Sequence, residues 1–133
     1  QISFPGGAFE KKDGTFLATA LRESEEEIGL SPHDVTVLGE LDDEVAMVTN
    51  YAITPFAGLI PYPYSFKIDR IEVAELIAVP LSFLLDPHSY HEVRLSDERI
   101  NYSYNYHGRI IWGATSRILK KFMDIWRQAQ NTL

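Results

Sequence analysis

The sequence contains no cysteine among its 133 residues. This absence excludes disulfide bonds, thiolate nucleophiles and thiolate metal ligands, so any metal site must use oxygen or imidazole ligands. A long apolar run is also missing, because the best stretch, from Ala74 to Leu85, is interrupted by Glu75 and Pro80. With no signal peptide at its start, the chain is expected in the cytoplasm or an organelle lumen, and not at a membrane.

Basic side chains are few. The sequence has 12 Lys and Arg residues and 19 Asp and Glu residues, which gives a formal net charge of −7 and a pI near 5.0. This balance argues against nucleic acid or an anionic membrane as the main partner. It leaves room for a small anionic substrate, since a bound divalent cation reverses the local sign. The length predicts a single domain over residues 1–133.

The first residues do not include a methionine, and Gln1-Ile2-Ser3-Phe4 reads like the middle of a strand. We interpret the chain as a domain lacking an N-terminal segment; the alternative is a complete processed domain.

The hydrophobic pattern predicts one α+β unit. Apolar residues from Phe16 to Ile28 recur at helical spacing, and Gly29 provides a stop. A second helix is expected over about residues 114–129, and one helical turn at Ser82–Leu85. Strands are expected at 35–41, 50–60, 76–79, 90–94, 100–106 and 109–112. We predict a mixed β-sheet sandwiched between helices, an α/β/α arrangement.

The predicted helix at 16–28 has one strongly acidic face. At about 100° per residue, Glu23, Glu26 and Glu27 fall together, opposite the apolar face. Like charges at this spacing repel, and a divalent cation would remove the penalty, because Mg²⁺ prefers hard oxygen ligands. Arg22 adjoins this face and can hold a carboxylate by a bidentate pair. The alternative is a merely solvated acidic surface.

Two stretches together form a more specific pattern: Ser3-Phe4-Pro5-Gly6-Gly7-Ala8 and Thr19-Ala20-Leu21-Arg22-Glu23-Ser24-Glu25-Glu26-Glu27-Ile28-Gly29-Leu30. They resemble the Nudix box of the Nudix hydrolases, a family that uses Mg²⁺ or Mn²⁺ to hydrolyse a nucleoside diphosphate linked to another moiety. The sequence departs from the family pattern in three details. Asp13 stands where the family usually has its first Glu, one extra residue separates it from Arg22, and Ser24 fills a usually apolar slot.

The resemblance extends to the coenzyme A diphosphatase branch of this family. The phrase Gln1–Gly7 is similar to that branch, as are residues 51–58 and 111–115. It implies hydrolysis of coenzyme A or acyl-CoA to 4′-(acyl)phosphopantetheine and adenosine 3′,5′-bisphosphate. Two alternatives stay open: a Nudix hydrolase acting on ADP-ribose or another nucleoside diphosphate derivative, and a non-catalytic Nudix-like ligand-binding domain.

The resemblance also implies the site residues. The expected metal ligands for Mg²⁺ or Mn²⁺ are Glu23, Glu27, Glu26 and the carbonyl of Gly7. The expected catalytic residues are Glu23, Glu26, Arg22 and Glu72, with Glu72 a candidate general base; the alternative for Glu72 is an exposed loop acid. The expected partner is a small diphosphate substrate related to coenzyme A, and because many relatives are dimers a homodimer stays open.

Overall fold

The computed structural model describes residues 1–47 and 49–132. The chain forms two compact units. The acidic-helix unit comprises Phe4–Asp42 and Thr54–Ile77, and the C-terminal unit comprises Gln1–Ser3, Asp43–Ile53 and Ala78–Leu133. The expectation of a single domain over 1–133 stays a prediction.

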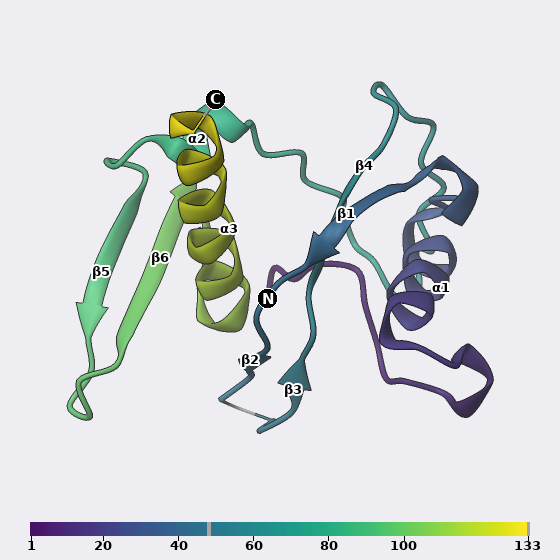
Figure 1. Ribbon diagram of the computed structural model, residues 1–133, viewed down its shortest axis with the longest axis horizontal. Coiled ribbons are helices and arrows are strands. Elements are labelled where there is room, and N and C mark those ends of the chain that lie inside the picture. The colour runs from purple at the N-terminus through teal and green to yellow at the C-terminus, as the bar shows by residue number, and fades with distance from the viewer. Residues whose placement is uncertain (48, 133) are drawn as a thin grey trace. The chain divides into compact units, whose positions relative to one another are not determined.

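The acidic-helix unit pairs one long helix with a two-stranded sheet (Figure 1). Its elements in chain order are η1 (Lys11–Asp13), α1 (Phe16–Ile28), η2 (Pro32–Asp34), β1 (Thr36–Glu40) and β4 (Phe56–Leu59). Strands β1 and β4 are antiparallel, with Thr36 opposite Leu59 and Glu40 opposite Phe56. The register shifts between Val37 and Gly39, which marks a bulge.

Helix α1 begins and ends where the sequence predicts. Thr15 is its N-cap, and its side-chain oxygen accepts a hydrogen bond from the amide of Ala18. Gly29 closes the helix in the left-handed conformation, with φ of 69°, and its amide donates to the Glu25 carbonyl. The face of the helix toward the sheet carries Leu17, Ala20, Leu21 and Ser24.

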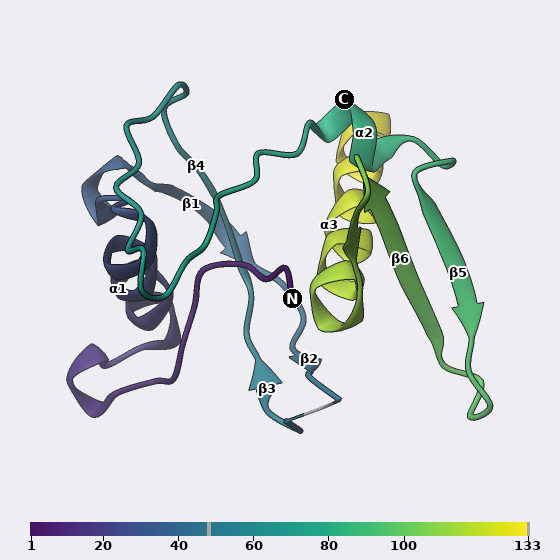
Figure 2. The same cartoon turned by 180° about the vertical axis from the view of Figure 1, so that it is seen from behind.

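The C-terminal unit has the better-buried core. It contains β2 (Glu44–Val45), β3 (Ala52–Ile53), α2 (Leu81–Leu85), β5 (Tyr90–Arg94), β6 (Ile100–Tyr106), β7 (Arg109–Ile111) and α3 (Gly113–Asn131). Strands β5, β6 and β7 form an antiparallel meander, and α3 lies along β6, as Figures 1 and 2 both show. Its core cluster is Leu84, Tyr104, Ile111 and Met123, each at most 6% exposed.

Two expected strands differ from the structure. The stretch 50–60 is divided into β3 and β4, because Pro55 lies between them and has no amide to continue a ladder. Residues 76–79 form no strand and pair with none among the described residues. This segment connects the two units, since one ends at Ile77 and the other resumes at Ala78.

The α+β class predicted from the sequence is confirmed: helices pack on sheets whose strand pairs, among the described residues, are all antiparallel. Within 1–47 and 49–132, no helix has the length and apolar content needed to cross a bilayer.

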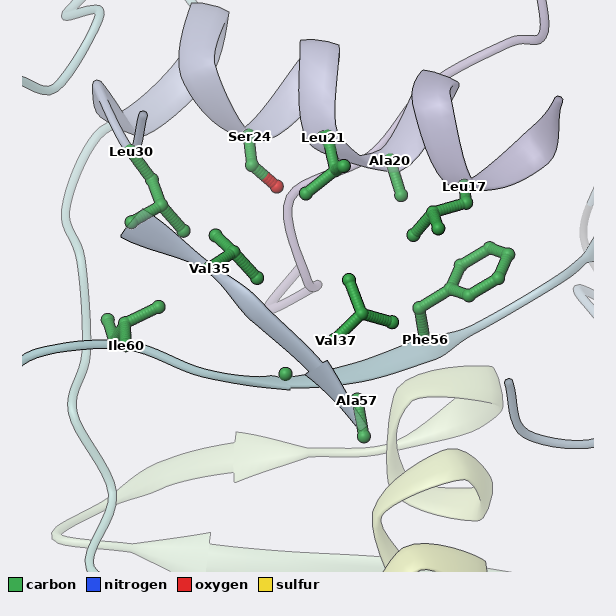
Figure 3. A pocket seen from close by; sticks show the side chains of 11 residues that line it. Leu17, Ala20, Leu21, Ser24, Leu30, Val35, Val37, Phe56, Ala57 and Ile60 are labelled. Atoms are coloured by element: carbon green, nitrogen blue, oxygen red, sulfur yellow. The ribbon is translucent and has the colours of Figure 1, made fainter. Parts of the chain in front are cut away.

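Between α1 and the β1–β4 sheet lies a largely apolar cavity of about 150 Å³. Figure 3 shows the side chains of α1 pointing toward those of Val35, Val37 and Phe56 across this space. The Ser24 hydroxyl is directed into it, at the position where the family pattern has an apolar residue. The helix is therefore seated on the sheet with incomplete packing beneath it.

Candidate active site

The opposite face of α1 borders a second cavity of the acidic-helix unit, here called the carboxylate pocket. It measures about 280 Å³ and is lined by Gly6, Gly7, Glu23, Glu26, Glu27, Asp69 and Glu72. Every side chain in this lining beyond the two glycines is an acid. Five carboxyl groups from one helix and one loop therefore face a common space.

The helix contributes three of these acids through its geometry. Glu23, Glu26 and Glu27 stand at i, i+3 and i+4, so they project from one side of α1. The apolar residues that hold the helix against the sheet project from the other side. Seating the helix and presenting the carboxylates are thus consequences of one amphipathic pattern.

The Gly6-Gly7 segment approaches the helix closely. The Gly6 amide donates a long hydrogen bond of 3.4 Å to Glu27 Oε1. A Cβ on Gly7 would lie 2.5 Å from the Glu23 carboxyl carbon, so any side chain there would displace that carboxylate. The glycine pair allows backbone and carboxylates to share this side of the pocket.

Arg22 organises the rim of the pocket. Its Nε donates to Asp13 Oδ1 at 2.8 Å and its Nη2 to Asp13 Oδ2 at 3.1 Å, a bidentate pair. Its Nη1 reaches Glu23 Oε1 at 3.0 Å and Glu26 Oε2 at 3.2 Å. Nη2 also donates to the Ala8 carbonyl. One guanidinium therefore links the loop before α1 to two carboxylates of the pocket.

Asp13 is held at the centre of this network. Its side chain is only 4% exposed, and it also accepts hydrogen bonds from the Thr19 hydroxyl at 2.8 Å and the Glu10 amide at 2.9 Å. The hydrogen bonds from Arg22 hold the pKa of the Asp13 carboxyl well below its usual range and raise the pKa of Arg22. Asp13 does not line the pocket, so its contacts support Arg22.

The loop over residues 67–72 of the acidic-helix unit brings in the remaining acids, Asp69 and Glu72. The Lys67 amide donates to the Ile28 carbonyl and the Asp69 amide to the Glu27 carbonyl, each at 2.9 Å. These carbonyls belong to the last turn of the helix, where no helical donor exists. The loop thereby caps α1 and carries Glu72 to the pocket.

Gly29 makes this attachment possible. A Cβ at Gly29 would lie 2.6 to 2.9 Å from the Cβ, amide nitrogen and carbonyl oxygen of Lys67. Backbone atoms at that distance cannot step aside as the end of a side chain can. Glycine is therefore required by the left-handed φ and by the close passage of the loop.

Glu27 has the most perturbed environment in the pocket. Burial raises the pKa of its carboxyl, the Gly6 amide opposes this, and the nearby acids Glu23 and Glu72 add to the rise. Accumulated negative charge of this kind is relieved when a cation binds.

The donor set suits a hard divalent cation, because it offers only oxygens and no nitrogen or sulfur ligand. Within the described residues, no three such side chains already converge on one point as metal ligands would. Glu23 and Glu26 line the pocket and also accept hydrogen bonds from Arg22. A cation bound by either carboxylate would therefore compete with the guanidinium for its oxygens.

The sequence-predicted residues Glu23, Glu26, Glu27, Glu72 and Gly7 are brought together in the carboxylate pocket, and Arg22 contacts two of them. Their predicted roles stay predictions. Sequence reasoning missed Asp69. The available signal was weak: an Asp in a loop, a residue type whose side chain accepts from the backbone amide two residues on. The four histidines do not belong to this lining.

Clustered carboxylates beside a Gly-Gly segment are typical of proteins whose site binds a divalent cation. The family model of the NUDIX domain matches residues 1–60, the segment that contains the bend and α1.

Curated relatives match a longer stretch. A protein named "Uncharacterized Nudix hydrolase NudL" from Photorhabdus laumondii is 39% identical over 122 residues, covering 90% of this chain and 65% of the relative. Proteins of the same name from Klebsiella pneumoniae and Escherichia coli are each 35% identical over 125 residues, covering 91% of this chain and 64% of the relative. The chain thus spans just under two thirds of the length of these relatives. Both comparisons point to the same family: the chain is similar to the NUDIX domain over residues 1–60 and to Nudix hydrolases over most of its length.

Proposed function

We propose that this chain hydrolyses a diphosphate linkage with the help of a divalent cation, Mg²⁺ or Mn²⁺. The observation that carries the proposal is the carboxylate pocket, in which five acids and two glycines of one unit face the same space. Similarity to the NUDIX domain and to Nudix hydrolases supports the same chemistry.

Glu23, Glu26, Glu27 and the Gly7 carbonyl would hold the cation. When bound, the cation supplies charge neutralisation for the diphosphate and lowers the pKa of an attacking water. The reaction adds the oxygen of water to one phosphorus and breaks the bridging P–O bond, which leaves two phosphate products. Positioning and electrostatic stabilisation account for most of the catalysis in such a transfer.

The remaining residues orient this arrangement. Glu72 is the proposed general base, because it faces the pocket from the loop and lies close enough to Glu27 to affect its pKa. Arg22 is a proposed positioning residue, because its guanidinium joins Asp13 and the Ala8 carbonyl to two carboxylates of the pocket. It holds Glu23 and Glu26 near the rim.

For the substrate, we propose coenzyme A or acyl-CoA, cleaved to 4′-(acyl)phosphopantetheine and adenosine 3′,5′-bisphosphate. The support is the similarity of residues 1–7, 51–58 and 111–115 to the coenzyme A diphosphatase branch. A small anionic substrate also fits the net charge of −7 once a cation neutralises the pocket.

The test is a substrate panel. Coenzyme A, an acyl-CoA, ADP-ribose and other nucleoside diphosphate derivatives are incubated with the protein and Mg²⁺ or Mn²⁺, and the products are separated. We expect adenosine 3′,5′-bisphosphate from coenzyme A, and no products after chelation of the cation. Turnover of ADP-ribose without turnover of coenzyme A would refute the substrate. Binding without turnover across the panel would favour a non-catalytic domain.

A further inference from the structure

The turn that carries Glu72 into the carboxylate pocket is built on Asp69. The Ile71 amide donates a hydrogen bond of 3.0 Å to Asp69 Oδ1. The amides of Glu72 and Val73 donate to the Asp69 carbonyl at 3.2 and 2.8 Å. An aspartate that accepts from the amide two residues on closes an Asx turn. Three consecutive backbone amides of the turn that contains Glu72 therefore donate to Asp69.

Asp69 also joins this turn to α1. Its amide donates to the Glu27 carbonyl at 2.9 Å. The backbone of a proposed cation ligand is thus connected, through one residue, to the turn that presents the proposed base. Hydrogen bonds between backbone groups therefore fix the distance between the backbones of Glu27 and Glu72.

The tip of the turn has little apolar packing. Ile71 is 95% exposed, so its side chain packs against almost nothing. Glu72 itself is exposed, while Val73 is half-buried. Besides the hydrogen bonds that Asp69 accepts, a long one of 3.5 Å runs from Arg70 Nη1 to the Ala74 carbonyl. The conformation of the exposed tip therefore depends on hydrogen bonds, and the shorter ones are those that Asp69 accepts.

We propose that Asp69 is a positioning residue, whose side-chain oxygen holds the turn that presents Glu72 to the carboxylate pocket. This inference rests on the proposed function for its catalytic consequence. The role of Asp69 depends on its Oδ1 atom as a hydrogen-bond acceptor. The turn does not require the negative charge of the carboxylate.

Two substitutions separate the acceptor from the charge. Asp69→Asn keeps an oxygen able to accept from the Ile71 amide, and asparagine closes the same kind of turn. Asp69→Ala removes the acceptor. The matched control is Asp86→Ala, because Asp86 Oδ1 accepts from the His88 amide at 2.9 Å in an equivalent turn of the C-terminal unit.

The first readout is amide hydrogen exchange of the cation-free protein. We expect Asp69→Ala to speed exchange at Ile71, Glu72 and Val73, and Asp69→Asn to leave it close to wild type. Asp86→Ala should change exchange only at its own turn. This readout is independent of substrate and cation.

The second readout is turnover of the active substrate from the panel. A displaced base lowers kcat, so Asp69→Ala should lose about tenfold or more in kcat with little change in KM. Asp69→Asn keeps the acceptor but removes one charge from the pocket lining, so it should lose clearly less kcat than Asp69→Ala. Asp86→Ala should match wild type.

The outcomes are distinguishable. An Asn variant as slow as the Ala variant would show that the charge matters, and would overturn the inference. Unchanged exchange and turnover in Asp69→Ala would overturn it as well. If Asp69→Ala fails to fold, Asp69→Ser replaces it in the test. The serine hydroxyl closes a weaker turn, so amide exchange at residues 71–73 should be faster than in wild type and in Asp69→Asn. Exchange in Asp69→Ser as slow as in wild type would overturn the inference. A wild-type protein that is inactive on every diphosphate would refute the proposed function. The exchange measurement would still show whether the Asp69 side chain holds the turn.

Discussion

The two units differ in what they bury. In the C-terminal unit, Leu84, Tyr104, Ile111 and Met123 form a cluster in which each residue is at most 6% exposed. In the acidic-helix unit, Ile28 is the one apolar residue that reaches this level among the described residues, and a cavity of about 150 Å³ lies beneath α1. The unit that carries the clustered acids is therefore the less tightly packed.

This difference teaches how the chain divides its tasks. Clustered carboxylates repel one another, and the helix that carries them is secured by caps, an arginine network and a docked loop more than by a dense core. The C-terminal unit gains its stability from apolar burial. Substitutions that affect catalysis and substitutions that affect stability should accordingly concentrate in different units.

The largest expected effect is in the carboxylate pocket. Glu27→Gln should lower turnover more than about a hundredfold, because it removes a negative oxygen from the proposed cation site. Its thermal unfolding should stay close to wild type. Glu25→Gln makes the same change on an exposed residue of α1 outside the pocket and should leave the rate unaltered. An unchanged rate in Glu27→Gln would refute the assignment of the cation site.

The core comparison can be tested directly by truncation. Met123→Ala should lower the free energy of unfolding by about 2–5 kcal/mol, since Met123 is 2% exposed in the core. Leu21→Ala, in the wall of the cavity beneath α1, should cost less than about 1.5 kcal/mol, because Leu21 is only half-buried. Denaturant unfolding measures both. Equal losses would show that the two units are packed alike.

The attachment of the loop to α1 depends on Gly29. Gly29→Ala should cost about 1–2 kcal/mol for the left-handed φ alone, with a further loss from the approach of Lys67. Gly108→Ala is the control, because Gly108 also has positive φ, at 83°, but nothing within 4 Å of the added Cβ. Thermal unfolding should place the Gly29 variant below the Gly108 variant, and its turnover should fall as Glu72 moves. Equal unfolding in the two variants would contradict the close approach.

Asp13→Asn should weaken the hold on Arg22 and reduce turnover by about tenfold, as loss of a supporting contact does. Its effect on stability should depend on pH. The pKa of Asp13 in the folded protein lies below its ordinary value of 3.8, so the contact stabilises above that pH and the contribution is lost as pH falls. Denaturant unfolding should show a constant difference from wild type near neutral pH and a smaller one in acid. A difference that grows in acid would contradict this sign.

The smallest effect is expected beneath α1. Ser24→Leu should raise the free energy of unfolding by about 0.5–1 kcal/mol, because it fills apolar space and improves helix propensity. Turnover should not change. Destabilisation would mean that the space beneath the helix cannot accept a larger side chain, and would weaken the contrast between the units.

Much of the acidic-helix unit could be predicted from local pattern. The bounds of α1 follow from its apolar period, the Thr15 cap and Gly29, all within one short stretch. The grouping of Glu23, Glu26 and Glu27 follows from helix geometry. Glu72 was predicted by resemblance and lies at the pocket.

What sequence reasoning missed depends on contacts distant in the chain. Asp69 reaches the pocket because its amide meets the Glu27 carbonyl, a pairing that no local pattern reveals. The expected strand at 76–79 has a β-like composition, but a strand needs a neighbour, and this stretch leads from one unit to the other. Pro55 was visible in the sequence and divides the 50–60 stretch as proline chemistry requires.

The contact between Asp13 and Arg22 bears on two of the three departures from the family pattern, the aspartate and the extra residue. A glutamate at position 13 would place its carboxylate about 1.5 Å, one carbon–carbon bond, further from its backbone, which the present 2.8 Å contact with Nε leaves no room for. We expect the extra residue and the shorter acid to compensate for each other, so reverting either one alone should disturb the guanidinium more than reverting both.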